Sequence, residues 1–295
     1  MKNKIIQYLP LTRPLASYAI TRKLVNLGIN VILDLEDSAQ DIFDDKKNIQ
    51  LKMLARNGLN EISKFKIHNK NSRIYIRINS PETEFYRDDI LTIKTCLINK
   101  FPIDGLFLPM VDSYDVILSL YNELDNKLEI VPMIETSSGM KNIEKILKQD
   151  VNEIIERVHY GNFDYSYSLG LWPFLDPNHD IYWDLISNML RILKKYNKSF
   201  VSSPFPFPHN EKLFWQCATY LEEKSELNEV WHCCVNSTLA TSKKPNSIKK
   251  LEILKYNFKV EQKIEIAKKI IFDFIKGRSN KRSFGVSEHR FIAPH

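Results

Sequence analysis

Short apolar runs alternate with longer helical patterns along this chain, and this alternation limits its possible folds more than any other feature. One example lies in Leu128–Gly139, where the apolar run Ile130–Ile134 stops at Glu135 and a helical pattern follows over Met140–Lys148. Short β-branched runs bounded by turn residues predict buried strands. Pro132 weakens the strand prediction somewhat, because proline cannot donate to a sheet ladder.

The same pattern recurs along the chain. The other predicted strands are Lys4–Leu9, Ile29–Leu35, Arg73–Ile78, Ile103–Leu108, Arg157–Phe163, Ser199–Ser203 and Val230–Val235. The other predicted helices are Ala16–Leu27, Lys46–Phe65, Asp88–Asn99, Tyr114–Leu124, Ile181–Lys195, Leu213–Lys224 and a basic, amphipathic Ser247–Lys276. About eight strand–helix alternations predict an α/β protein with a (β/α)8 TIM barrel. We expect a catalytic barrel over residues 1–245 and a helical extension over 246–295 that serves as a lid or an oligomer contact.

Composition narrows the class of function. The 42 basic and 36 acidic residues are scattered, giving a charge of +6 that suits an anionic substrate. No nucleic-acid motif, bilayer-spanning run or secretory signal is recognisable, so neither nucleic acid nor membrane is an expected partner. The cysteines lack metal-ligand spacing, which favours free thiols in the cytoplasm. They are Cys96, Cys217, Cys233 and Cys234.

Polar side chains gather where the predicted strands end. They are Arg13, Glu36, Asp37, Arg77, Asn79, Glu135 and Asp164. In a barrel these residues would converge on the C-terminal rim, where barrel enzymes place their sites. Glu135 and Asp164, without His or Cys beside them, predict a hard oxygen site for Mg²⁺ or Mn²⁺. The planar fork of Arg77 matches a carboxylate or an enolate oxygen.

Each of these residues also has a purely structural interpretation. Glu135 and Asp164 could cap the helices that follow them. Arg77 could form a surface ion pair, and Glu36 and Asp37 could belong to a solvated loop. The recurrence of polar groups at several strand ends favours a functional site over these separate explanations.

Several of these segments resemble one enzyme family in order and spacing. They are Leu33–Ser38, Arg77–Asn79, Gly105–Val111, Ile134–Gly139 and Gly161–Asp164, followed by Leu169–Gly170. From about Tyr8 to Gly170 the chain resembles the citrate lyase β-subunit-like enzymes of the HpcH/HpaI aldolase superfamily. The resemblance implies a Mg²⁺-dependent carbon–carbon lyase on a TIM barrel that assembles as a homo-oligomer, a trimer or a hexamer.

The resemblance also implies roles for the rim residues. Glu135 and Asp164 are expected to bind the metal, and Arg77 to hold a substrate carboxylate or enolate oxygen. Glu36 and Asp37 are expected to act near metal-bound water. The substrate-binding set is Arg13, Arg77 and Asn79.

The general acid–base stays open. A C-terminal segment of the family supplies a catalytic Asp, but no Asp follows Gly277 in this chain. The leading hypothesis is cleavage or formation of a 3-hydroxy-acyl thioester, such as a CoA thioester, or of a related hydroxy acid, through a metal-stabilised enolate. One alternative is a 2-oxo-acid (pyruvate) aldolase acting on a sugar-like or other aldehyde. Another is a catalytically silent relative that binds a small acid.

Overall fold

The computed structural model describes residues 4–39, 45–67, 71–125, 128–169, 177–257 and 262. In this part of the chain, parallel strands pair in the order β1 to β8, and β8 closes onto β1. They are β1 (Lys4–Pro10), β2 (Asn30–Asp34), β3 (Ile74–Arg77), β4 (Gly105–Leu108), β5 (Glu129–Ile134), β6 (Arg157–Tyr160), β7 (Ser199–Val201) and β8 (Val230–Cys234). The predicted TIM barrel is confirmed.

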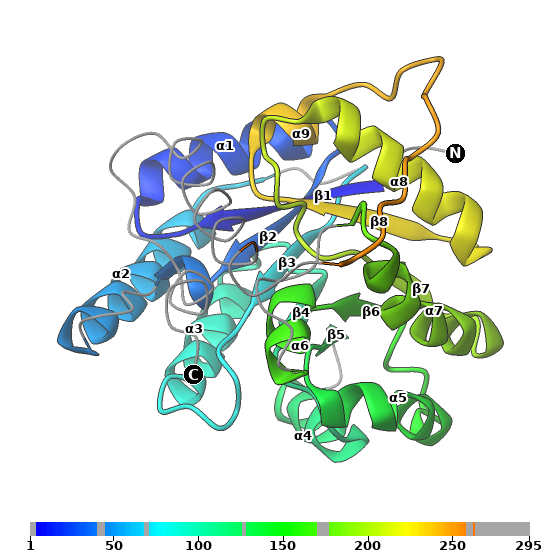
Figure 1. Ribbon diagram of the computed structural model, residues 1–295. Helices are drawn as coiled ribbons and strands as arrows, with labels where there is room; N and C mark the ends of the chain where they lie inside the picture. Colours follow the sequence, from blue (N-terminus) through cyan, green and yellow to red (C-terminus); the bar gives the residue numbers. More distant parts are fainter. Residues whose placement is uncertain are drawn as a thin grey trace.

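Helices surround this barrel (Figure 1). They are α1 (Pro14–Asn26), α2 (Asp45–Ser63), α3 (Tyr86–Ile98), α4 (Tyr114–Glu123), α5 (Ser137–Gln149), α6 (Asn162–Ser168), α7 (Asp180–Lys195), α8 (Glu211–Ser225) and α9 (Ser237–Thr241), with a 3₁₀ turn η1 (Asp37–Ala39). None of the helices in the described part of the chain has both the length and the apolar character that a bilayer span needs. All four cysteines are buried free thiols.

Two predicted elements differ from the structure. The strand expected over Arg157–Phe163 ends at Tyr160, because the chain turns into α6 at Asn162. Residue 262 of the helix expected over Ser247–Lys276 is helical, but residues 247–257 are not. There Leu254 instead bridges His179. Residues 258–261 and 263–276 of that prediction lie outside the described residues.

Side chains alternate between two cores. One fills the barrel interior with Ile6, Tyr8, Ile32, Tyr75, Phe107, Val131, Met133, Val201, Trp231 and Cys233. The other lies between the sheet and the helices and contains most of the remaining buried apolar residues. Burying one Val, Leu, Ile or Phe side chain contributes about 1.5–3 kcal/mol. Residues two positions apart on a strand point to the same face. Ile32, Tyr75 and Met133 face the barrel interior. The residues two positions later, Asp34, Arg77 and Glu135, therefore point toward the barrel axis at the strand ends.

Candidate active site at the C-terminal rim

A buried ion pair joins the ends of β2 and β3. Asp34 and Arg77 are direct partners in the parallel register. The Arg77 guanidinium donates from Nε and from Nη2 to the two carboxylate oxygens of Asp34, both at 2.7 Å. Burial raises the pKa of Asp34, but this bidentate pair outweighs burial and leaves the pKa below its usual value. The sequence-based prediction missed Asp34, although Asp34 lies two positions after Ile32 and therefore on the inward face of β2.

Glu36 and Asp37 reach the other side of the same guanidinium. Nη1 of Arg77 lies 2.8 Å from Glu36 Oε2 and donates to Asp37 Oδ2 at 3.0 Å. The two carboxylates are 22% and 26% exposed, whereas that of Asp34 is 2% exposed. Burial and the nearby charges of Asp37 and Glu135 raise the pKa of Glu36 well above its usual range, against the lowering effect of Arg77. Glu36 and Glu135, on loops after β2 and β5, therefore interact electrostatically across the rim.

Glu135 follows β5 and is buried at 4% exposure. The N–H of Met110 donates to its Oε1 at 2.8 Å, and Met110 holds a left-handed backbone at φ 56° to do so. A Cβ at Gly161, just after β6, would lie 2.4 Å from both Cβ and Oε2 of Glu135. Glycine at this position therefore leaves the space that the Glu135 carboxylate occupies.

Asp164 stands in the first turn of α6, three residues beyond Gly161. It is half-buried. The helix is anchored at Asn162, whose N–H donates to Ser203 Oγ at 2.8 Å. Asp164 and Glu135 therefore follow neighbouring paired strands on one rim. Arg13 is exposed at the start of α1, beyond the end of β1 on the same rim.

Asn79 lies behind the rim rather than on it. Its side-chain N–H groups donate to Leu35 O (3.1 Å) and Asp89 Oδ2 (2.7 Å), and its Oδ1 accepts from Lys52 Nζ (2.6 Å). Asn79 is 2% exposed. Both N–H groups are thus used within the protein, so the structure assigns Asn79 to supporting the β2 and β3 ends instead of the predicted substrate contact. Lys52, on α2, is a second residue that sequence analysis missed.

The floor of the site is a pair of polar side chains inside the barrel. His159 Nδ1 lies 3.1 Å from Val201 O, which can only accept, so Nδ1 carries the proton. Nε2 therefore accepts from the Tyr8 hydroxyl, also at 3.1 Å. Burial lowers the pKa of His159 to about 3, which keeps the ring neutral. The Tyr8 ring lies 4.6 Å from the Arg77 guanidinium carbon and supports it from below.

We define the acidic rim as Asp34, Glu36, Asp37, Glu135 and Asp164. Arg77 pairs with Asp34, Glu36 and Asp37, and Lys52 donates to the backbone carbonyl of Glu36. Within the described residues, no three His, Cys, Asp or Glu side chains form a ready-made metal site. Mg²⁺ is commonly held by only one or two carboxylates, with water and substrate completing its octahedron. The oxygen-donor chemistry of Glu135 and Asp164 fits such an ion.

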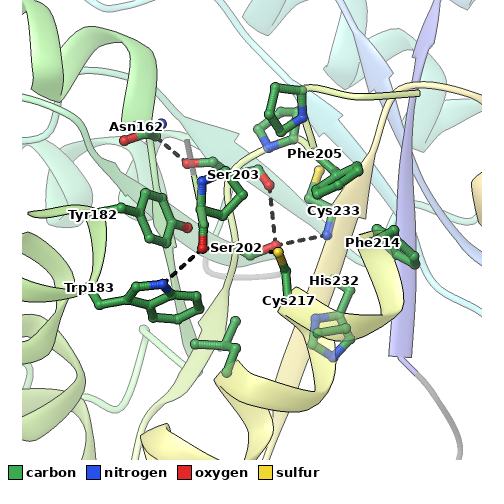
Figure 2. A pocket seen from close by; sticks show the side chains of 15 residues that line it. Asn162, Tyr182, Trp183, Ser202, Ser203, Phe205, Phe214, Cys217, His232 and Cys233 are labelled. Atoms are coloured by element: carbon green, nitrogen blue, oxygen red, sulfur yellow. Dashed lines mark hydrogen bonds between the residues drawn. The ribbon is translucent and has the colours of Figure 1, made fainter. Parts of the chain in front are cut away.

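A separate cavity of about 40 Å³ lies between β7, β8 and helices α7 and α8. Figure 2 shows Tyr182, Trp183 and Phe214 facing it, with Ser202 and Ser203 along one wall. The loop after β7, residues 204–209, closes one side of the cavity through Phe205. No residue of the acidic rim lines this cavity, so its position argues for a packing gap beside the rim rather than for the reaction site.

Comparison with known proteins identifies the family of this chain. The model of the HpcH/HpaI aldolase/citrate lyase family matches residues 11–173, more than half of the chain. No curated protein matches the chain in sequence.

Solved structures resemble it at low identity. RipC from Yersinia pestis is 17% identical, with a TM-score of 0.57 over 82% of this chain and 96% of RipC. The citrate lyase β subunit of M. tuberculosis, complexed with oxaloacetate and magnesium, is 16% identical, with a TM-score of 0.61 over 81% of this chain and 93% of that one. CitE from Mycobacterium tuberculosis, in complex with magnesium, acetoacetate and coenzyme A, is 15% identical, with a TM-score of 0.61 over 98% and 96%.

These structural likenesses support the fold, and the family match covers the strand ends that build the acidic rim from β2 to β6. The chain belongs to the HpcH/HpaI aldolase/citrate lyase family and is thereby a carbon–carbon lyase by class.

Proposed function

We propose that this protein is a Mg²⁺-dependent carbon–carbon lyase that acts on a small anionic hydroxy acid or its thioester at the C-terminal rim. The observation that carries the proposal is the acidic rim itself. It gathers five carboxylates at one end of the barrel, and two of them, Glu135 and Asp164, follow the adjacent strands β5 and β6. Carboxylates gathered in this way repel one another until a cation compensates them.

Glu135 and Asp164 would hold the metal. Bound there, Mg²⁺ would polarise an oxygen of the substrate and neutralise the charge that develops on it during cleavage. The protein fixes Glu135 through the N–H of Met110 and the space left by Gly161. Pre-positioned ligands of this kind need little rearrangement when the ion binds.

Arg77 would orient the substrate through one edge of its guanidinium. Nε and Nη2 are committed to the buried carboxylate of Asp34. Nη1 faces Glu36 and Asp37, both of which are partly exposed. A substrate carboxylate arriving from solvent can therefore compete with these two side chains for Nη1, and Arg13 at the rim would add a second positive charge.

Glu36 is the proposed proton-transfer group. Its pKa is raised well above the usual range by burial and by the charges of Asp37 and Glu135. A carboxyl group in such surroundings can hold a proton near neutral pH and release it when the local charge changes. This assignment offers a local acid–base for a chain that lacks an Asp after Gly277.

Molecules bound to the solved relatives support the proposed substrate class. Their structures contain oxaloacetate, pyruvate, acetoacetate and coenzyme A. We favour the thioester and keep the 2-oxo-acid aldolase as the second candidate. A homo-oligomer in the cytoplasm stays a prediction, and light scattering on the full chain at micromolar concentration tests the oligomer.

Calorimetric titration with Mg²⁺ or Mn²⁺ tests the metal site. We expect binding to wild type and a loss of affinity in Glu135→Gln and Asp164→Asn. Glu129→Gln is the matched control, because Glu129 begins the same strand, β5, at the opposite end of the barrel. Equal affinity in all four proteins would exclude the site.

Proton exchange in D₂O tests the chemistry without requiring the true substrate. We expect Mg²⁺-dependent loss of the methyl proton signal of pyruvate, or of the α-proton signal of acetyl-CoA, measured by NMR. Exchange of acetyl-CoA alone supports the thioester lyase, and exchange of pyruvate alone supports the 2-oxo-acid aldolase. Glu135→Gln should reduce the exchange rate by about 10²–10³-fold, as removal of a charge-stabilising group does. Silence with both compounds would favour the catalytically silent relative.

A further inference from the structure

A charged side chain lies buried directly behind the acidic rim. Lys52 of α2 is only 2% exposed. Its ammonium donates to Asn79 Oδ1 at 2.6 Å, to Glu36 O at 2.7 Å and to Leu35 O at 3.2 Å. An ammonium has three N–H donors, so all of them are used.

These bonds hold the loop that carries Glu36 and Asp37. The Asp34 carboxylate accepts from the N–H groups of Glu36 and Ser38, both at 3.0 Å. Lys52 binds two carbonyl groups of the same loop. Four backbone groups of residues 35–38 are therefore fixed by two side chains of opposite charge, one from the end of β2 and one from α2.

Asn79, the side-chain partner of Lys52, is itself held by residues of two helices. Asp89 of α3 accepts from the backbone N–H of Asn79 at 2.8 Å and from its side chain at 2.7 Å. Arg56, one turn after Lys52 on α2, donates to Asp89 Oδ1 at 3.2 Å. The ends of β2 and β3 are thus tied through Asn79 to two helices.

This arrangement is a costly way to pack a helix on a sheet. Burying an ammonium costs several kcal/mol before its partners compensate it, and an apolar side chain would fill the same space without that penalty. What the ammonium adds is direction, since its donors fix carbonyl groups at defined positions beside the rim.

We propose that Lys52 is a positioning residue of the lyase: it holds the loop 35–38 so that the Glu36 and Asp37 carboxylates face Arg77 and the substrate. Lys52 contacts the backbone of this loop and the side chain of Asn79. It would influence the reaction only through the carboxylates of Glu36 and Asp37. The inference rests on the proposed function for its catalytic consequence, but its structural half can be tested independently.

The catalytic test is a double-mutant cycle between Lys52→Met and Glu36→Gln, with the D₂O exchange rate at saturating substrate as the readout. We expect Lys52→Met to lower the maximal rate by about 10-fold with little change in KM, because loop misplacement affects the reacting geometry. In the Glu36→Gln background the same change should cost about twofold or less, since coupled residues are not additive. Equal losses in both backgrounds would overturn the proposal.

Lys46→Met is the matched control. It removes the same charge from the first turn of α2, where the side chain is exposed, and we expect a rate within about twofold of wild type. If Lys52→Met does not fold, Lys52→Gln replaces it in the cycle. Its amide keeps two N–H donors, so we expect the loop to be partly held and the maximal rate to fall by less than about 10-fold. In the Glu36→Gln background, Lys52→Gln should again lower the rate by about twofold or less.

Amide hydrogen exchange of residues 35–38 tests the positioning without any turnover. We expect it to be about 10-fold faster in Lys52→Met, or in Lys52→Gln, than in Lys46→Met, because local opening becomes easier when the clamp is lost. Unchanged protection would overturn the proposal. If wild type exchanges neither pyruvate nor acetyl-CoA, the proposed function fails, while this measurement still decides whether Lys52 holds the loop.

Discussion

The two ends of the barrel both carry buried charges, but they balance them differently. At the N-terminal end, a basal network combines three cations with three carboxylates: Lys4, Arg73, Arg157, Glu129, Glu156 and Glu229. Tyr75 completes it by donating to Glu129 at 2.9 Å. At the C-terminal end, five carboxylates form the acidic rim, and three of them share the guanidinium of Arg77. The base joins equal numbers of opposite charges, whereas the rim gathers several carboxylates around one arginine.

The difference separates stability from function within one barrel. Arg157 is fully buried and stacks on Trp231, with its guanidinium carbon 4.5 Å from the ring centre. It shares carboxylates with Arg73 and so closes the base of the barrel. A self-compensated network of this kind has no need for a ligand. A cluster of carboxylates, at the end where barrel enzymes bind their substrates, is suited to receive a metal ion.

The largest expected effect comes from breaking the buried pair at the rim. Arg77→Met leaves Asp34 charged and buried, and we expect the free energy of unfolding to fall by about 3–5 kcal/mol. Arg157→Met should cost less, about 1–3 kcal/mol, because its partner Glu129 keeps Arg73 and Tyr75, and its partner Glu156 is 52% exposed and can be solvated. Urea unfolding of both variants measures the difference.

A second substitution separates charge from packing in that experiment. Adding Asp34→Asn to Arg77→Met removes the unpaired charge while keeping an acceptor for one of the two N–H groups, of Glu36 and Ser38, that bind Asp34. We expect it to recover a substantial part of the loss. Equal losses for Arg77→Met and Arg157→Met would contradict the contrast between the two ends.

The sequence allows the barrel and much of the rim to be predicted, because strand ends are local features. The apolar run before Glu135 and the alternation that brings Arg77 to the end of β3 are visible in the residues themselves. Contacts between distant segments are not. Lys52 reaches Asn79 across 27 positions and Arg77 reaches Asp34 across 43, so neither partnership has a local signal. The helix predicted from Ser247 was wrong over residues 247–257, where Leu254 bridges His179 and this contact between distant segments overrides the periodic pattern.

A pH titration of stability sharpens the comparison at the base. Burial and the charge of Glu156 raise the pKa of Glu129 from its ordinary value of 4.5 to about 7, although the charge of Arg157 acts in the opposite direction. Between pH 4.5 and 7 the folded state therefore keeps a proton that the unfolded state releases, so this group's contribution to stability falls as pH rises through that window. The loss amounts to about 3 kcal/mol.

Glu129→Gln isolates this contribution from the other titrating groups. Relative to wild type, its free energy of unfolding should rise by about 3 kcal/mol between pH 4.5 and 7.5, as measured by urea unfolding at several pH values. Proton exchange of pyruvate or acetyl-CoA at constant pH should be unchanged, because Glu129 lies at the opposite end of the barrel from the rim. A stability difference that is independent of pH would refute the assignment.

The smallest expected effect distinguishes the two ends by a single methyl group. A Cβ at Gly161 would lie 2.4 Å from Glu135 at the rim, and a Cβ at Gly105 would lie 2.5 Å from Glu129 O at the base. Both alanine variants should lose about 1–3 kcal/mol of stability through overpacking. Only Gly161→Ala displaces a proposed metal ligand, so it alone should weaken Mg²⁺ binding, by about tenfold for each 1.4 kcal/mol lost from the site. Calorimetric titration of the two variants side by side decides the matter, because their steric defects are nearly the same while their distances from the rim are not. Equal metal affinity in both would mean that Glu135 does not bind the ion, and the functional contrast between the ends of the barrel would then need another origin.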